Sequence, residues 1–150
     1  MLVVCHGQPS IALYAAQAAA ALGAATVIFH CASQAVLTAA ESLGAIPVMT
    51  SFERRAGRWP IVVDCGQDPA VLQYTIASTE PGGVLHSVSY YPNPRVIPLA
   101  LGKLYTWGIQ FHTSERRVRE AKRRADVVHL ERRVDLVASG SCPRDLDHAR

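Results

Sequence analysis

The first residues that could do chemistry form a short polar break, residues 6–10 (HGQPS), between an apolar run and an alanine-rich segment. A turn that leads from a strand into a helix presents unpaired backbone N–H groups and the positive end of the helix dipole, which favour a phosphate group. Gly7 alone satisfies the G-x-G-x-x-G pattern of dinucleotide-binding turns, with Cys5 and Ser10 at the other two glycine positions. The spacing indicates either a phosphate-binding turn or a plain strand–helix turn in a domain of another function.

Several soft ligands and one carboxylate fall at the ends of apolar runs. If those runs are neighbouring strands about 4.8 Å apart, the ligands could converge on zinc: His6, His30, Cys5, Cys31 and Cys65. The simpler interpretation, which we adopt, is that cysteine fills positions that need small residues and that no metal ligand or catalytic residue can be assigned. Asp64 could likewise be a general base, but a residue at this place more often braces a neighbouring turn.

The elements that must position these residues alternate regularly between strand and helix. Apolar runs predict strands at 1–5, 26–30, 46–49, 61–64, 84–89 and 109–112, and the intervening segments predict helices at 10–22, 33–43, 69–78 and 99–103. Pro81-Gly82-Gly83 predicts a turn before the fifth strand. Short connections between alternating elements favour an α/β fold, with an open, doubly wound, parallel six-stranded sheet of the Rossmann type.

Composition is consistent with one folded domain and a different C-terminal segment. The chain has 150 residues, of which 49% are hydrophobic and 18% charged, so disorder is excluded. Residues 1–113 form the predicted domain. From residue 115 onward the chain has ten Lys or Arg and seven Asp or Glu, which predicts that 114–150 is a basic helical extension with a frayed end. Interleaved acids favour an ion-paired helix face over nucleic-acid binding.

The expected location follows from cysteines and hydropathy. Four cysteines without a C-x-x-C pair favour free thiols and a cytoplasmic protein. Residues 11–29 contain no charge, but their alanine content and the interruptions by Gln17 and Gly23 favour a buried helix followed by a strand. We therefore expect no membrane span.

Seven short motifs, in this order and spacing, carry a resemblance to a known family. They are residues 2–5 (LVVC), 10–17 (SIALYAAQ), 21–24 (ALGA), 40–45 (AESLGA), 63–66 (VDCG), 80–83 (EPGG) and 108–111 (GIQF). Together they resemble the coenzyme domain of zinc-type, medium-chain alcohol dehydrogenases over about three-quarters of the chain. In that family a zinc-bound alcohol loses its proton and passes a hydride to the nicotinamide.

The resemblance implies how NAD or NADP would bind and how the chain would assemble. The pyrophosphate would lie over Gly7, Gln8, Pro9, Ser10 and Ile11. The adenosine ribose would lie near Cys31, and the nicotinamide near Cys65, Gly66, Val88, Ser89 and Phe111. The family also pairs subunits through the edge of the sixth strand, which predicts a homodimer.

Three features of the sequence depart from the family. Cys5 and, in versions with a longer turn, Ala12 stand where the family has glycine. No acidic residue for the ribose hydroxyls follows the second strand, in residues 29–33 (FHCAS), so the preference between NAD and NADP stays open. No segment resembles the family's catalytic domain, and we expect this truncated chain to be inactive in hydride transfer alone. The alternative is a degenerate, non-catalytic Rossmann module for nucleotide binding or dimerisation.

Overall fold

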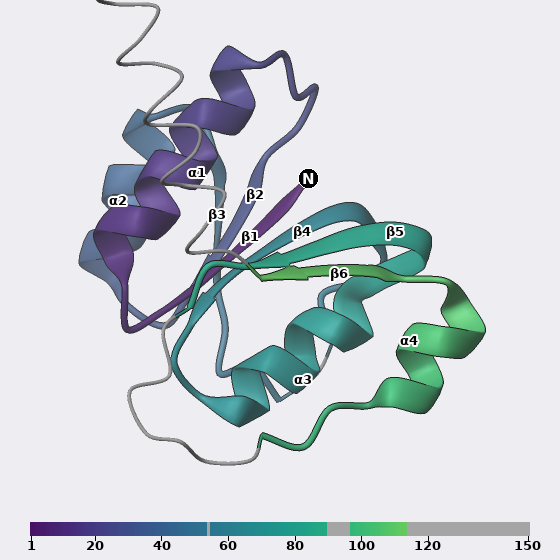
Figure 1. Ribbon diagram of the computed structural model, residues 1–150. Helices are drawn as coiled ribbons and strands as arrows, with labels where there is room; N and C mark the ends of the chain where they lie inside the picture. Colours follow the sequence, from purple (N-terminus) through teal and green to yellow (C-terminus); the bar gives the residue numbers. More distant parts are fainter. Residues whose placement is uncertain (54, 90–96, 114–150) are drawn as a thin grey trace, which may run out of the picture. The chain divides into compact units, whose positions relative to one another are not determined.

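A computed structural model describes residues 1–53, 55–89 and 97–113. They form a six-stranded, all-parallel sheet in the order β3-β2-β1-β4-β5-β6 (Figure 1). The strands are β1 (Leu2–His6), β2 (Ile28–Cys31), β3 (Ile46–Met49), β4 (Trp59–Gly66), β5 (Thr79–Ser87) and β6 (Gln110–Thr113). The predicted doubly wound open sheet is confirmed, and its order reverses between β1 and β4.

Four helices cover the two faces of this sheet. They are α1 (Pro9–Ala21), α2 (Gln34–Ser42), α3 (Pro69–Ser78) and α4 (Leu101–Trp107). Figure 1 shows α1 and α2 on one face of the sheet and α3 and α4 on the other. This division follows from right-handed crossovers that run outward from the centre in both directions.

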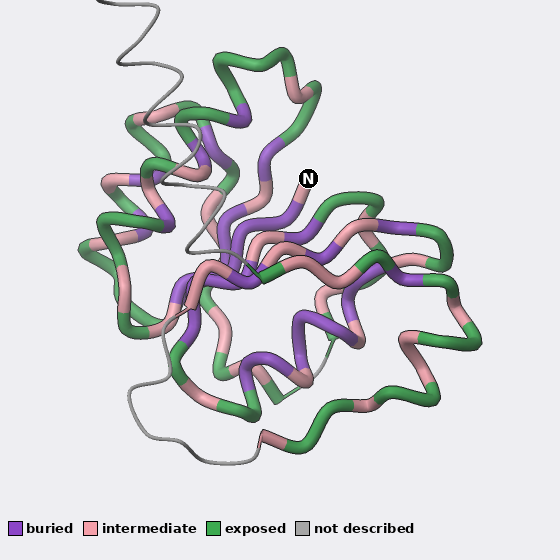
Figure 2. Tube along the Cα trace, viewed as in Figure 1, coloured by how far each residue is buried: buried purple, intermediate pink, exposed green. Residues whose placement is uncertain are grey.

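Burial on both faces explains why the central strands are apolar throughout. Val3, Cys5 and Phe29 pack in one core cluster with the alanines of α1. Leu2, Val4 and Val62 alternate with them and pack in a second cluster around α3. Figure 2 shows both layers as buried segments inside a more exposed outline. Alanine on the inner face of α1 lets the helix approach the sheet closely.

Several boundaries differ from the sequence prediction. The largest difference is at Pro81-Gly82-Gly83, which lies as an irregularity within the span of β5 and does not precede the strand. The pairing of β4 with β5 shifts register between Trp59 and Ile61. A Cβ at Gly83 would lie 2.9 Å from two backbone carbonyl oxygens. One of these oxygens, that of Pro60, belongs to β4, and the other, that of Glu80, belongs to β5 itself. Glycine therefore allows both the approach of the two strands and the local bend of β5.

The first residues of three helices can be compared with the prediction. Gln8, not Ser10, is the N-cap of α1, because Pro9 already occupies the first turn. The predicted start of α3 is confirmed: Asp68 is its N-cap and accepts a 2.8 Å hydrogen bond from the N–H of Ala70. Helix α4 begins at Leu101 and not at residue 99.

Residues 1–113 form one compact unit. The basic helix predicted over 114–150 lies outside the described residues, so that helix and the boundary at 113/114 stay predictions. In the described part of the chain, no helix has the length and apolar character needed to cross a membrane. The uncharged stretch 11–29 is divided between α1, a turn and β2.

Candidate functional site

The carboxyl ends of the central strands meet at one edge of the sheet. Cys5 pairs in register with Cys31 on β2 and with Cys65 on β4, and β1 and β4 end one residue later at His6 and Gly66. In a doubly wound sheet the crevice outside these ends, where the strand order reverses, is the place where ligands bind. The structure thus brings the β1–α1 turn and the ends of β2 and β4 together.

Gly7 gives the β1–α1 turn its shape. Its φ is +97°, a left-handed conformation that side chains rarely adopt, and the residue is exposed. An isolated backbone bridge joins Gly7 to Gly66 across the reversal point. A Cβ at Gly7 would lie 3.2 Å from Oε1 of Gln67. The turn therefore has a bare backbone at its surface, as a phosphate-binding turn requires.

The first turn of α1 has donors that no side chain caps. The N-cap, Gln8, makes no side-chain hydrogen bond to the helix, and the N–H groups of a first turn have no intrahelical acceptor. Pro9 has no N–H, so the donors offered here are those of Ser10 and Ile11, both exposed. With the helix dipole they form an environment that favours an anion.

Two buried polar atoms without a hydrogen-bond partner lie in the same turn. They are Nδ1 of His6 and Oε1 of Gln8, and no other described side chain has such an atom. Buried polar atoms are nearly always paired, so an unpaired atom on either side of Gly7 calls for an explanation. An ordered water beneath the turn, or a ligand group reached after a rotation of the side chain, would pair with them.

The two residues that stand where the family has glycine, Cys5 and Ala12, are packed below this turn. Cys5 and Ala12 are 2% and 0% exposed and belong to the same core cluster as Cys65. Ser10, which the motif spacing placed at the third glycine position, is exposed. The close contact of helix and sheet is therefore made by Ala12, the position that corresponds to glycine in versions of the motif with a longer turn.

Asp64 braces the ends of β4 and β5. It is completely buried. One carboxylate oxygen accepts a 3.0 Å hydrogen bond from the N–H of Gly66, and the other accepts one of 2.8 Å from the hydroxyl of Ser87. Burial raises its pKa, while these hydrogen bonds and the nearby His6 oppose the shift. The contacts of Asp64 are those of a structural brace.

The same residue holds the segment that follows β5. Its backbone carbonyl accepts hydrogen bonds from the N–H of Val88 at 2.9 Å and from the hydroxyl of Ser89 at 3.3 Å. Val88 and Ser89 thus lie just past the end of β5, beside Gly66. Phe111 does not join them, because it pairs with Leu85 inside β6 and packs against the core on the α3 side.

Three thiols lie together beneath the turn. Cys5, Cys31 and Cys65 are free and buried. Burial, with a smaller contribution from Cys31, raises the pKa of Cys5 to about 12, and burial also raises the pKa of Cys65. Among the described residues no group of three or more His, Cys, Asp or Glu is arranged to hold a metal ion.

These thiols should be inert while the protein is folded, because thiolate is the reactive form. In a Cys142→Ser variant, which leaves only the three described cysteines, we expect labelling by a thiol-specific chromogenic reagent at pH 8 to be at least about a hundredfold slower than in urea. Rapid labelling of one thiol without denaturant would contradict the buried placement. Free cysteine added to the same reagent controls for its intrinsic rate.

An aromatic cluster beside the turn was missed by the sequence analysis. The rings of His6 and Tyr74 both lie edge-on to the ring of Phe52, whose φ is +63°. Tyr74 also shares a 2.6 Å hydrogen bond with Nδ1 of the buried His30, and burial lowers the pKa of His30. The only signal for this cluster was one phenylalanine, Phe52, beside charged residues in the segment between the third and fourth predicted strands.

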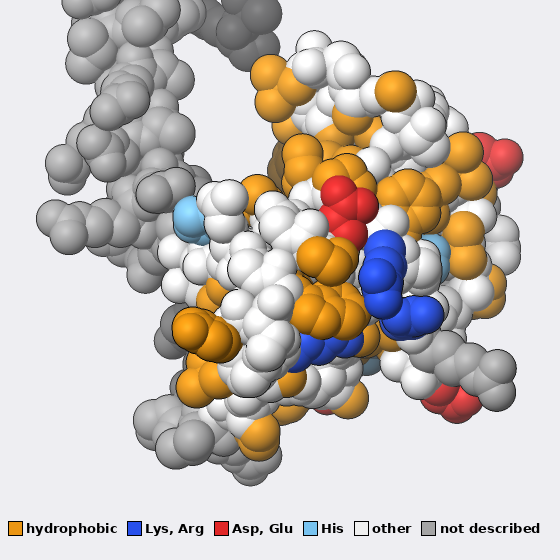
Figure 3. Space-filling view, turned by 90° about the vertical axis from the view of Figure 1, so that its right-hand side faces the viewer, with side chains coloured by type: hydrophobic (Ala, Val, Ile, Leu, Met, Phe, Trp, Pro, Cys, Tyr) orange, Lys and Arg blue, Asp and Glu red, His pale blue; other side chains and the backbone are white. Residues whose placement is uncertain are grey.

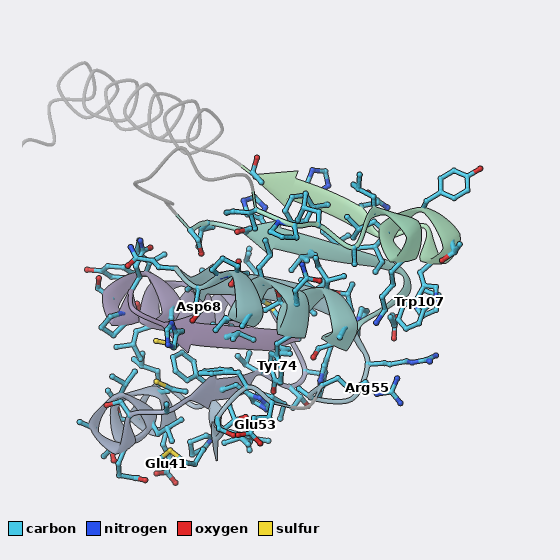
Figure 4. The ribbon with its side chains drawn as sticks, turned by 90° about the horizontal axis from the view of Figure 1, so that it is seen from below. Glu41, Glu53, Arg55, Asp68, Tyr74 and Trp107 are labelled. Atoms are coloured by element: carbon cyan, nitrogen blue, oxygen red, sulfur yellow. The ribbon has the colours of Figure 1, made fainter. Side chains whose placement is uncertain are left out.

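The cluster forms the floor of a cavity of about 610 Å³ between α3 and the β3–β4 crossover. Figure 4 shows Tyr74 on α3, Asp68 at the start of that helix and Glu53 on the crossover around this space. The cavity adjoins the β1–α1 turn through His6. The candidate site therefore continues from the carboxyl edge of the sheet onto the α3 side.

No protein-family model and no curated protein matches the sequence. Solved structures do match it, and they define the class of fold. The alcohol dehydrogenase TADH of Thermus sp. ATN1 superimposes with a TM-score of 0.62 at 24% identity over 75% of this chain and 35% of that one. A zinc-binding dehydrogenase of Sinorhizobium meliloti 1021 bound to NADP has a TM-score of 0.67 at 19% identity, over 76% and 36%.

A third similar structure is described as a short chain alcohol dehydrogenase (rspB) of Escherichia coli CFT073 with NADH, and it has a TM-score of 0.65 at 15% identity over 76% of this chain and 36% of that one. The chain spans about a third of the length of these proteins. It has the Rossmann fold that they contain, as the motif resemblance predicted.

Proposed function

We propose that residues 1–113 bind NAD or NADP at the carboxyl edge of the sheet, as the coenzyme-binding portion of an oxidoreductase similar to zinc-type alcohol dehydrogenases. The observation that carries this proposal is the pair of unpartnered buried atoms, on His6 and Gln8, that flank the bare backbone of Gly7 at the reversal point of the sheet. Ligand-bound neighbours of the same fold, with NADP and with NADH, support it.

Each part of the cofactor would have its own contacts. The pyrophosphate would lie over Gly7 to Ile11, on the N–H groups of Ser10 and Ile11. The ribose of adenosine would lie near Cys31, and the nicotinamide near Cys65, Gly66, Val88 and Ser89. The nicotinamide ring supplies hydride chemistry when it is bound. The chain's own contribution is to bind and orient it, with Asp64 holding the strand ends in place.

The activity of the complete protein would draw on more than this domain. The structural neighbours are about three times as long as the part that matches, so we propose that hydride transfer between an alcohol and the nicotinamide, and any zinc, need a catalytic domain as well. Strand β6 is an edge strand, and we propose that it pairs with β6 of a second copy in a cytoplasmic homodimer.

Two observations favour a second candidate, a non-catalytic nucleotide-binding or dimerisation module. No carboxylate follows β2 to accept the ribose hydroxyls, since the residues there are Cys31, Ala32 and Ser33. Pro9 also removes one of the N–H groups that a phosphate would contact. Cofactor affinity separates the two candidates.

Titration of the full chain with NAD and with NADP by calorimetry tests the proposal. We expect micromolar binding of at least one of them, and a Gln8→Ala variant should bind roughly tenfold more weakly because a hydrogen bond in a buried site is lost. Gln17→Ala, on the exposed side of the same helix, is the matched control and should bind normally. No binding at millimolar cofactor would reject the proposal and favour the non-catalytic module.

A further inference from the structure

Every lysine and arginine that the structure describes lies in one place, at the amino edge of the sheet. Arg55 and Arg58 belong to the crossover that leads into β4, and Lys103 belongs to α4. Figure 3 shows Lys and Arg side chains gathered among hydrophobic ones on this face, with one acidic side chain beside them. In Figure 4, Arg55 and Trp107 are at the same end of the domain. We call Arg55, Arg58, Lys103 and Trp107 the cation cluster.

The indole of Trp107 is the centre of this cluster. Cζ of Arg58 lies 4.8 Å from the centroid of the ring, and Nζ of Lys103 lies 4.2 Å from it. Both distances are within the range of cation–π contacts. The ring thus holds two like charges, from segments 45 residues apart in sequence, close to each other at a partly exposed surface.

The backbone between the two arginines is anchored. The N–H of Ala56 donates a 2.9 Å hydrogen bond to the hydroxyl of Ser78, and its carbonyl accepts one of 2.7 Å from the indole N–H of Trp59. Gly57, with a φ of +89°, turns the chain between them. Arg55 and Arg58 therefore project from a fixed loop, which lowers the entropy that a ligand would have to remove.

An acidic side chain lies on the same face as the cluster (Figure 3), but it is not paired with the three cations. None of the three cations forms an ion pair with a residue that the structure describes. Burial and then the charges of Arg55 and Arg58 lower the pKa of Lys103. Like charges held together in this way are stabilised when an anion binds between them.

From this arrangement we propose that Arg55, Arg58 and Lys103 form a binding site for a phosphate-type oxyanion. Guanidinium groups match two oxygens of a phosphate at once, and an ammonium adds a compact charge with three donors. Trp107 serves as the support that positions Arg58 and Lys103, because its ring already carries them. The ligand is therefore a phosphoryl group bound by its oxygens, and not a base stacked on the indole.

This site is separate from the proposed cofactor site. Arg58 directly precedes β4, whereas Gly66 ends that strand eight residues later, a span of roughly 25 Å. The pyrophosphate of a dinucleotide at the β1–α1 turn would lie beyond the reach of Arg58 and Lys103, whereas Arg55 also lines the cavity that extends to His6. The inference stands without the proposed function, and a failure of one leaves the other intact.

The test titrates inorganic phosphate and inorganic pyrophosphate into the full chain by calorimetry at low ionic strength, with sodium chloride of equal ionic strength as the blank. We expect saturable binding, weakened roughly fivefold or more in both Arg58→Gln and Lys103→Gln. Lys103→Arg keeps the charge and should remain within about twofold of the natural chain. Lys122→Gln removes one positive charge from the C-terminal segment and is the matched control.

A third titration, with a short single-stranded oligonucleotide, identifies the source of the phosphate. If Lys103→Gln weakens binding of the oligonucleotide, the site is assigned to a nucleic-acid backbone. If it weakens binding of phosphate and pyrophosphate alone, the site is assigned to a small phosphorylated molecule. Circular dichroism and urea midpoints show that each variant is folded. Equal losses in Lys103→Gln and Lys122→Gln, or a response to sodium chloride as large as that to phosphate, would overturn the proposal.

Discussion

Replacing Asp64 by alanine is expected to lower the free energy of unfolding of the domain by about 2–4 kcal/mol. The substitution removes both acceptors of a fully buried network, so the N–H of Gly66 and the hydroxyl of Ser87 lose their partners. The backbone carbonyl of residue 64 still accepts the hydrogen bonds from Val88 and Ser89, so the loss is confined to the side-chain contacts. Urea denaturation followed by circular dichroism measures the change in free energy.

Asp64→Asn is the informative companion, because an amide oxygen can still accept the N–H of Gly66. We expect it to cost less than the alanine variant and to change the pH dependence of stability. Burial raises the pKa of Asp64 in the folded chain above its ordinary value of 3.8. At a pH between 3.8 and the raised pKa, the folded protein therefore binds more protons than the unfolded chain. The contribution of Asp64 to stability therefore falls as pH rises through that window.

The difference between the natural chain and Asp64→Asn isolates this contribution, because both contain His30. The lowered pKa of His30 contributes in the opposite direction, with stability that grows as pH rises toward its ordinary value of 6.5. We expect the stability advantage of the natural chain over Asp64→Asn to be greatest at acid pH and to shrink as the pH is raised. A constant difference from pH 4 to pH 7 would contradict the placement of a buried ionisable carboxyl here.

Replacing Gly7 by valine should abolish cofactor binding, with affinity reduced by at least about a hundredfold. The new side chain would occupy the bare surface where the pyrophosphate must approach, and its Cβ would meet Gln67 at 3.2 Å. The φ of +97° adds backbone strain of about 1–3 kcal/mol. Calorimetric titration with NAD and NADP gives the affinity, and urea denaturation gives the stability.

Gly23→Val provides the matched control for this strain. Gly23 has a φ of +85°, no atom would lie within 4 Å of a Cβ at this position, and the residue follows the opposite end of α1. We expect a similar loss of stability with cofactor affinity unchanged. If Gly7→Val and Gly23→Val reduced binding equally, the effect would be one of general destabilisation, and the turn would have no special role in binding.

The regular part of the fold could be predicted because its signals are local. Each central strand is buried on both faces, so Leu2 to Cys5 and the run around Val62 appear as continuous apolar segments, and each helix between them has its own start or stop residue. The carboxyl ends of these parallel strands must then share one edge. Strand order and strand direction alone therefore predicted that Gly7, Cys31 and Cys65 lie near one another.

Details that depend on contact between strands were misjudged. The glycines of Pro81-Gly82-Gly83 have the composition of a turn, and only the register shift against β4 shows that they lie within β5. Ser10 and Ala12 each fit a glycine spacing of the motif, and Ala12 makes the close contact of helix and sheet. Spacing along the chain does not define which small residue faces the sheet, because that depends on where the helix begins.

By itself, the sequence determined the order of strands and helices and the turn that a dinucleotide would approach, because hydrophobic periodicity and turn residues act over a few neighbours. Only the tertiary structure decided the rest. It showed that His6 and Gln8 keep unpartnered buried atoms, that Asp64 braces two strand ends, and that Arg58 and Lys103 meet on Trp107. Those contacts join residues far apart in the chain, and their partners are chosen by the packing of the whole fold.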